Sequence, residues 1–211
     1  MLTRRRPQPL GWATVVVLCF SLLAAACSSD PVAPTTTAPS GFTVQSDAKA
    51  GFAIAVPADW TVIPLNINPN AFNKNANDLR LANPKLASIL NKARVVGQSG
   101  GKFMAVSKDG VADVNLTVDK PKEKTIEQVV TNSIAGLTSL EATSIAQSPT
   151  TLSGKPAVKV TFRLPVDTDA GRIPTDEVQH YLLSGGKAYI LTVSAAPADV
   201  ANAVATSLRL R

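Results

Sequence analysis

The sequence predicts an α+β fold in which an antiparallel β-sheet is flanked by helices. Segments in which large apolar residues alternate with small or polar ones outnumber segments with helical spacing. Tight turns such as Asp109-Gly110 and Gly185-Gly186 join several of these segments, which favours antiparallel pairing. Three helical segments lie between the groups of strands, and helices so placed bury their apolar stripes by covering the sheet.

The first 26 residues have the pattern of a bacterial lipoprotein signal peptide. Arginines at positions 4–6 precede a run without charge from Gly11 to Ala26, and small residues lead directly into Cys27. This run is shorter than the apolar stretch of about 20 residues that a membrane-spanning helix needs. We therefore expect residues 1–26 to be removed. Cys27 then becomes the palmitate-bearing first residue of a mature protein on the extracytoplasmic face of the cell membrane.

Residues 27–41 are predicted to form a mobile tether, because serine, threonine, proline and alanine cannot bury enough apolar surface to fold. The run Thr35–Thr37 is a hypothetical site of sugar attachment. The second cysteine, Cys19, is removed with the signal peptide. The mature chain therefore has no disulfide and no cysteine metal site, and residues 42–211 must fold on their apolar core.

The mild charge of the mature chain gives no sign of a nucleic-acid surface, and the expected extracytoplasmic location disfavours one. The net charge is +6, but three of the 21 basic residues belong to the signal peptide, which leaves 18 basic against 15 acidic residues and a mild +3. A loose basic group is interpreted as a solvated helix surface, because it is not arranged as a face that reads phosphates. Its members are Arg80, Lys85, Lys92 and Arg94.

The folded domain is predicted to begin near Phe42. Gly51–Pro57 alternates large apolar residues with alanine, which predicts a half-buried strand. A turn after it leads into a second strand at Thr61–Ile63, and we expect the two to form a hairpin. Asn66–Asn83 is rich in asparagine and predicts irregular structure with one short helical turn at Asp78–Leu81.

Helical spacing first appears after this segment. Asn83 is the expected cap and Pro84 the first helical residue, and the helix is predicted to run to about Val95 and to end at Gly97. Its apolar stripe is Leu86, Ile89, Leu90 and Ala93. Next, Phe103–Val106 and Val111–Val118 form a predicted strand pair whose buried face carries Val114, Leu116 and Val118.

The second half of the domain alternates in the same way. Thr125 and Gln128 have the spacing of a capping box, which predicts a helix to about Leu140 with Ile126, Val129, Val130, Ile134 and Leu137 buried. Four antiparallel strands are then expected, at Glu141–Ser148, Ala157–Leu164, Glu177–Leu183 and Lys187–Ser194. A last helix opens at Pro197, with Val200, Ala203, Val204 and Leu208 facing inward.

Four stretches carry a resemblance to a known family: residues 51–60 (GFAIAVPADW), 113–118 (DVNLTV), 153–162 (SGKPAVKVTF) and 186–194 (GKAYILTVS). In this order the chain resembles the PsbP-like, or Mog-type, family, and especially the exported actinobacterial lipoproteins of mycobacterial type related to LpqN and LpqT. The resemblance implies an α/β/α sandwich over residues 42–211. It also implies an accessory or partner-binding role without a shared catalytic set, so no active site is carried over.

The residues alone assemble no catalytic site. His180 is the only histidine and lies on a predicted strand, and no Gly-x-Ser-x-Gly elbow supplies a nucleophile, so it is interpreted as an ordinary strand residue. Asp167, Asp169 and Gly171 resemble the opening of a calcium loop, but Val178 stands where that loop needs glutamate. This segment is interpreted as a solvated turn.

Two further patterns are interpreted as structural. The pairs Gly101-Lys102 and Gly186-Lys187 lack the frame of a phosphate-binding loop and predict turns. Trp60 and Tyr189 lie in strand patterns, where packing in the core is the expectation. The sequence therefore predicts no catalytic residue, no metal site and no cofactor.

Three functions are weighed. The first is a non-catalytic binding or accessory module, held at the membrane by the lipid on Cys27, with an envelope protein or lipid as partner. The alternative is a carrier of a lipid or other apolar envelope molecule, because alanines such as Ala53 and Ala55 could leave room between sheet and helices. The third is an envelope polymer hydrolase, which would need two buried acids facing one cleft.

Overall fold

The computed structural model describes residues 32–65, 69–168 and 171–211. The predicted signal peptide, Cys27 and the first residues of the tether lie outside them. Ten strands form two antiparallel sheets, one ordered β3-β4-β5-β9-β8-β7-β6 and one ordered β1-β2-β10. The strands are β1 (Phe42–Asp47), β2 (Phe52–Pro57), β3 (Thr61–Val62), β4 (Gly101–Val106), β5 (Asp113–Asp119), β6 (Thr143–Leu152), β7 (Lys155–Thr168), β8 (Gly171–Ser184), β9 (Lys187–Ser194) and β10 (Arg209–Leu210).

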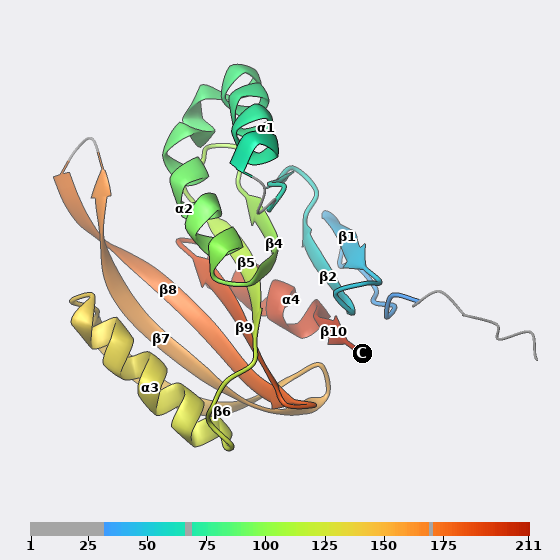
Figure 1. Ribbon diagram of the computed structural model, residues 1–211, viewed down its shortest axis with the longest axis vertical. Coiled ribbons are helices and arrows are strands. Elements are labelled where there is room, and N and C mark those ends of the chain that lie inside the picture. The colour runs from blue at the N-terminus through green and yellow to red at the C-terminus, as the bar shows by residue number, and fades with distance from the viewer. Residues whose placement is uncertain (1–31, 66–68, 169–170) are drawn as a thin grey trace, which may run out of the picture. The chain divides into compact units, whose positions relative to one another are not determined.

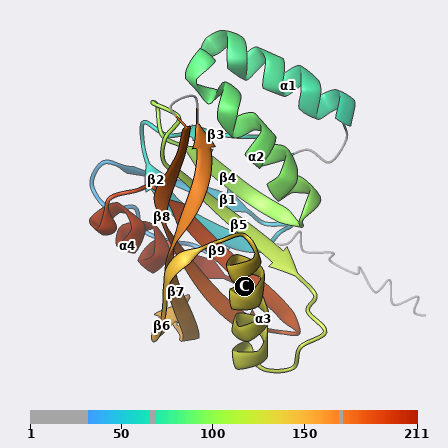
Figure 2. The same ribbon diagram turned by 90° about the vertical axis from the view of Figure 1, so that its left-hand side faces the viewer.

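Helices cover both faces of the larger sheet, as the α+β prediction requires. They are α1 (Pro69–Ala82), the 3-10 turn η1 (Pro84–Leu86), α2 (Ala87–Gln98), α3 (Ile126–Ser139) and α4 (Ala198–Ser207). On one face α2 packs on β4 and α3 on β7 and β8, while α4 packs on β2 behind the other face (Figures 1 and 2). The second face of the large sheet is thus shared by the small sheet and α4.

Three apolar clusters hold these layers together. The largest lies between the two sheets and α4 and includes Ile54, Leu116 and Leu191, which are fully buried. A second cluster lies under α2, and a third lies under α3. Burying such side chains contributes about 1.5–3 kcal/mol each relative to leaving them in water, so the domain needs no disulfide.

Several local signals are confirmed. The Asp109-Gly110 turn joins β4 to β5, with Val106 opposite Asp113. The Thr125 hydroxyl accepts from the Gln128 N–H at 3.3 Å, and the Gln128 side chain accepts from the Lys124 N–H at 3.1 Å. The five predicted apolar residues of this helix all lie in the cluster under α3.

The predicted hairpin between the first two strands is wrong. β2 pairs with β1 and β10, whereas β3 pairs with β4 in the other sheet. The reason lies in burial: Phe52–Val56 is buried at every position, so the strand is covered on both faces. Its alanines admit a close neighbour, since the Ala55 N–H donates to Ser207 Oγ of α4 at 2.8 Å.

The prediction of irregular structure at Asn66–Asn83 is also wrong, because α1 spans most of it. Asparagine disfavours a helix interior, but Ala76 and Leu79 pack on the cluster under α2, and tertiary packing overrides a weak propensity. Pro84 opens the 3-10 turn η1 rather than the helix, and α2 begins at Ala87 with Leu86 at its N-cap position; the Asn83 side chain donates to the Lys108 carbonyl at 3.0 Å. That helix continues through Gly97 to Gln98.

In α4 the inward face differs from the prediction by one side chain. Val204 and Leu208 are fully buried and Val200 packs on the core, as expected. Ala203 is only half-buried, and Ala201 and Ala205 take the buried positions beside Val204.

Candidate functional site

A buried polar cluster lies where α2 crosses the centre of the large sheet. The strand register places Asp113 of β5 and Glu177 of β8 on either side of Ser194 of β9. Residues opposite one another point to the same face, so the three side chains form one row across the sheet. All three residues are at most 5% exposed. This position would ordinarily be apolar core.

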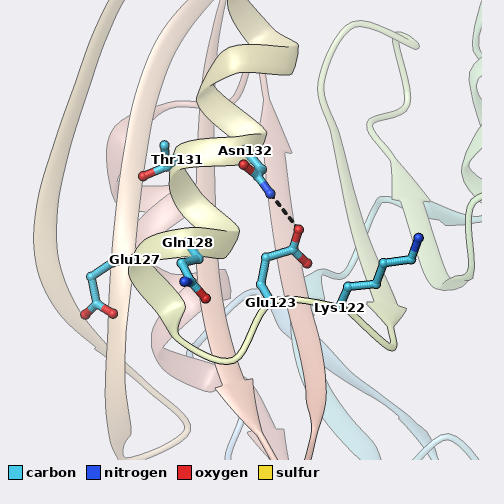
Figure 3. Close-up of a pocket in the computed structure, with 6 residues that line it drawn as sticks. All are labelled: Lys122, Glu123, Glu127, Gln128, Thr131 and Asn132. Carbon is cyan, nitrogen blue, oxygen red and sulfur yellow. Dashed lines mark hydrogen bonds between the residues drawn. The ribbon is translucent and has the colours of Figure 1, made fainter.

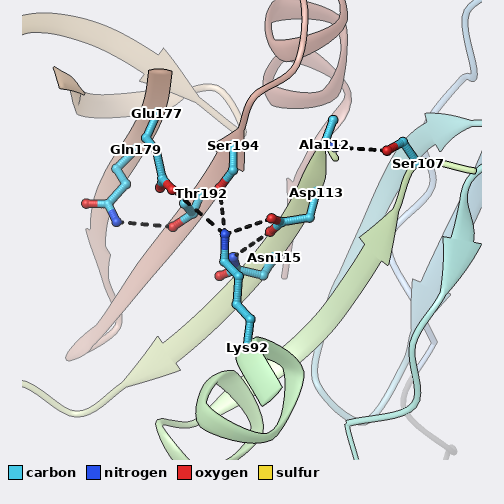
Figure 4. A network of polar contacts seen from close by, with 9 residues as sticks. All are labelled: Lys92, Ser107, Ala112, Asp113, Asn115, Glu177, Gln179, Thr192 and Ser194. Carbon is cyan, nitrogen blue, oxygen red and sulfur yellow. Dashed lines mark hydrogen bonds and ion pairs between the residues drawn. The ribbon is translucent and has the colours of Figure 1, made fainter. Parts of the chain in front are cut away.

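The side chain of Lys92 of α2 points toward this row (Figure 4). Its Nζ lies 2.7 Å from Asp113 Oδ1 and 3.8 Å from Glu177 Oε1, and it donates to Ser194 Oγ at 2.8 Å. The Lys92 side chain remains 36% exposed, so one side of the ammonium group meets solvent. A single cation therefore contacts two buried carboxylates on two different strands.

A second polar row lies one step along the same strands. Asn115, Thr192 and Gln179 are opposite one another, and Gln179 Nε2 donates to Thr192 Oγ1 at 3.3 Å. The Asn115 amide donates to Asp113 Oδ2 at 3.5 Å, which links the rows. The Tyr181 hydroxyl donates to the side-chain amide oxygen Oε1 of Gln179 and extends the network toward α3.

Burial controls the electrostatics of the cluster. It raises the pKa of Glu177 above its usual 4.5; Lys92 opposes this rise, while the negative charge of Asp113 adds to it. Burial likewise raises the pKa of Tyr181. Burial therefore favours the neutral form of both groups more than water does. The positive charge of Lys92 stabilises the ionised form of Glu177.

The arrangement resembles a serine–lysine nucleophile pair only in distance. A lysine activates serine as a neutral amine that takes a proton. Lys92 is instead an ammonium ion held by two carboxylates, so it donates to Ser194 and has no lone pair to accept with. Ser194 is also only 2% exposed, which keeps a substrate carbonyl from its Oγ. The geometry is that of a satisfied ion-pair network.

The interpretation of the basic group as a solvated surface is wrong for Lys92. Arg80 and Arg94 are exposed, and Arg94 donates to the side chain of Asn91 at 3.0 Å. The Lys85 side chain lies outside the described residues. The signal that sequence reasoning missed is the polar alternation of Asp113, Asn115 and Thr117 in β5, which looks like a solvent face but lies under α2.

His180 is a core residue of the opposite face, as predicted. It is 4% exposed, and neither ring nitrogen has a hydrogen-bond partner among the described residues. Burial, with a smaller contribution from the charge of Lys159, lowers the pKa of His180 from 6.5 to about 4. The imidazole is therefore neutral near pH 7, without the acid or serine that a catalytic histidine needs.

The remaining candidates stay structural or lie outside the described residues. Asp169 and Cys27 belong to the latter group. Within the described parts of the chain no three histidine, cysteine or acidic side chains meet as a possible metal site. Gly185-Gly186 forms the β8–β9 turn, and Gly101 opens β4. Tyr189 is buried between the sheets, and Trp60 packs half-buried against the same cluster.

Two surface hollows flank α3. One of about 470 Å³ lies at the start of the helix, where the Asn132 amide donates to Glu123 at 2.5 Å (Figure 3). This bond and a backbone hydrogen bond lower the pKa of Glu123. The other, of about 350 Å³, lies between α3 and β6 and is lined by Val130, Pro149 and Val158 among others. Neither hollow is lined by a residue of the Lys92 row.

Comparison with known proteins identifies the class of fold. No family model and no curated protein matches the sequence significantly. The solution structure of the cyanobacterial PsbP protein CyanoP, from Synechocystis, matches with a TM-score of 0.53 at 11% identity over 85% of this chain and 98% of that one. The chain therefore has a PsbP-like α+β fold.

A second solved structure is similar at a lower level. The crystal structure of LpqN, described as involved in cell envelope biogenesis of Mycobacterium tuberculosis, matches with a TM-score of 0.38 at 13% identity over 87% of each chain.

Proposed function

We propose that this chain is a lipid-anchored protein of the extracytoplasmic membrane face that acts as a non-catalytic binding or accessory module of the cell envelope. The observation that carries the proposal is the order of basic residues, uncharged run and Cys27, which leads through a short tether into one PsbP-like domain. No helix among the described residues is long and apolar enough to cross a membrane. Attachment through lipid supplies the membrane link instead.

The buried cluster supports a non-catalytic role. Its one lysine contacts both of its acids, and its nucleophile candidate Ser194 is buried and accepts from that lysine. An enzyme site usually leaves a reactive group accessible and poised to exchange a proton. The contacts of Lys92 with Asp113, Glu177 and Ser194 instead hold α2 on the sheet.

Replacing Cys27 with serine is expected to abolish lipid attachment, because serine lacks the thiol that is acylated. The unchanged chain should fractionate with membranes, and its intact mass should show loss of residues 1–26 and gain of lipid. The Cys27→Ser chain should lack the lipid mass. Replacing Cys19, which lies in the removed segment, is the matched control and should change neither property. A native mature chain without lipid mass would overturn the anchoring proposal.

Crosslinking in intact envelopes tests the accessory role. A module should yield one recurrent protein partner whose recovery saturates as the amount of the chain increases. Recovery of a stoichiometric apolar molecule with no protein partner would favour the carrier. The alanines that motivated the carrier are accounted for by packing, since Ala53 and Ala55 are fully buried and α4 bonds directly to the Ala55 backbone.

One observation favours a hydrolase as the second candidate. Asp113 and Glu177 are two buried acids within reach of one point, and Glu177 has a raised pKa, as a general acid would. Lys92 occupies the space between them, however. Envelope polymer incubated with the protein should release no fragments. Release that disappears in Asp113→Asn, with the fold retained, would establish the hydrolase instead.

A further inference from the structure

Several turns meet at one end of the large sheet. The β8–β9 turn places Ser184 opposite Lys187, and Lys155 at the start of β7 donates to Ser184 Oγ at 2.7 Å. In the neighbouring β6–β7 turn, Ser153 Oγ accepts from the Leu210 N–H at 2.8 Å. This hydrogen bond brings β10 to the same end of the sheet. The Arg211 N–H in turn donates to the Gly51 carbonyl at 3.0 Å. One continuous edge results.

This edge, here called the basic rim, collects half of the positive charge of the mature chain. Its nine cations are Lys49, Lys102, Lys120, Lys122, Lys124, Lys155, Lys187, Arg209 and Arg211, and all but Lys155 are exposed. Four acids lie among them, Asp47, Asp119, Glu123 and Glu127. The rest of the mature chain carries nine basic and eleven acidic residues, so the rim alone is strongly positive.

None of the rim cations forms an ion pair among the described residues. The ion pairs formed by the described residues involve Lys92, Arg163 and Arg172, which all lie away from the rim. The first three acids of the rim are held by amides: Asp47 accepts from the Ala50 N–H, Asp119 from the Lys120 N–H and Glu123 from Asn132. Lys155 donates to Ser184 Oγ and Arg209 to two backbone carbonyls, but no rim cation has an acid within 4 Å among the described residues.

The tether meets the domain beside this rim. The Thr36 hydroxyl donates to the Ser207 carbonyl at 2.6 Å, at the last turn of α4 and just before β10. The last carbonyls of a helix have no partner within the helix, and the Thr36 hydroxyl donates to one of them. In Figure 1 the start of the described chain and the C-terminus accordingly lie on the same side. The docked tether thus leaves the domain near Arg209 and Arg211.

The length of the free tether limits which end of the sheet can meet the membrane. Nine steps separate Cys27 from Thr36, which span at most about 32 Å when fully extended. β8 runs from the rim to the opposite end over 14 residues, which is roughly 45 Å at the rise of a strand. The free tether is thus shorter than β8, which disfavours an inverted domain with the Gly171 end of β8 on the membrane while Thr36 stays docked.

From charge and reach together we infer that the basic rim is a docking surface for anionic lipid headgroups, an inference that rests on the proposed lipid anchor. Juxtamembrane basic residues are attracted to anionic lipids within about a Debye length of the surface. The rim therefore orients the domain with its turns on the bilayer. The opposite end of the sheet, where β8 begins at Gly171, faces away from the membrane.

Fluorescence quenching in vesicles tests the orientation. Thr151 near the rim and Val111 in the β4–β5 turn, away from the rim, are exposed, and each is replaced by cysteine and labelled in the mature lipidated chain. The vesicles contain phosphatidylcholine, with or without phosphatidylglycerol, and a headgroup quencher. At low salt the Thr151 label should be quenched at least about threefold more than the Val111 label in anionic vesicles, and about 1 M salt should remove the difference.

Charge reversal supplies the matched variants. Lys120→Glu, Lys122→Glu and Lys187→Glu together should reduce the excess quenching at least about tenfold. Lys74→Glu, Arg94→Glu and Lys108→Glu change the net charge equally away from the rim and should leave it intact. Equal loss in both triple variants, or equal quenching in neutral vesicles, would overturn the inference. A reactive Cys27 thiol would instead report failure of the anchor, independently of the rim.

Discussion

Replacing Lys92 with methionine is expected to destabilise the domain by about 3 kcal/mol, because it leaves Asp113 and Glu177 buried without their cation. Breaking a buried ion pair from one side costs about 3–5 kcal/mol, and the partial exposure of Lys92 places this site at the lower end. Methionine preserves most of the apolar length of the side chain. Urea denaturation at pH 7 measures the change in the free energy of unfolding.

Two comparisons make this result specific to the cluster. Lys74→Met, at an exposed position of α1, should change stability by less than about 0.5 kcal/mol. Adding Glu177→Gln to Lys92→Met should recover part of the loss, since it removes one uncompensated charge. A loss below about 1 kcal/mol for Lys92→Met would show that solvent already neutralises the acids.

The pH dependence of the Lys92→Met variant follows from the raised pKa of Glu177. The folded domain binds the Glu177 proton more tightly than the unfolded chain does. This contribution to stability is fully present below pH 4.5, the usual pKa of glutamate, and is lost as pH rises through the higher pKa of the folded state. Without Lys92 the pKa of Glu177 rises further. The variant should therefore lose more stability at pH 8 than at pH 5.

Replacing His180 with leucine is expected to stabilise the domain, most strongly in acid. At pH 7 leucine removes two buried nitrogens without hydrogen-bond partners, a gain of about 1–2 kcal/mol. The lowered pKa of His180 adds a pH-dependent contribution. In the unfolded chain the imidazole takes up a proton below pH 6.5, whereas in the folded chain it does so only at about pH 4.

The stability of the native domain should therefore fall as pH decreases from 6.5 to 4, by about 3 kcal/mol in total, and this fall should be absent in His180→Leu. Denaturation series at several pH values measure both curves. His180 is the only histidine of the chain, so no other imidazole can produce the slope. A variant that keeps the native slope between pH 6.5 and 5 would assign the titration to another group.

The sequence by itself determined the features that depend on a few neighbouring residues. Thr125 and Gln128 lie within one helical turn, so the capping box was visible before the structure. Asp109-Gly110 and Gly185-Gly186 define their turns because few other residues adopt the required backbone angles. These signals sufficed to predict the α+β class and the order of most elements.

Only the tertiary structure decided the features that depend on partners far apart in the chain. α1 is a helix because α2 offers an apolar surface, and β2 pairs with β1 and β10, which come from opposite ends of the domain. Asp113 looks like a solvent-facing strand residue until β8, β9 and α2 surround it with Glu177, Ser194 and Lys92. Local patterns state whether a residue is polar. Which charge neutralises it, and whether water reaches it, depends on packing between distant elements.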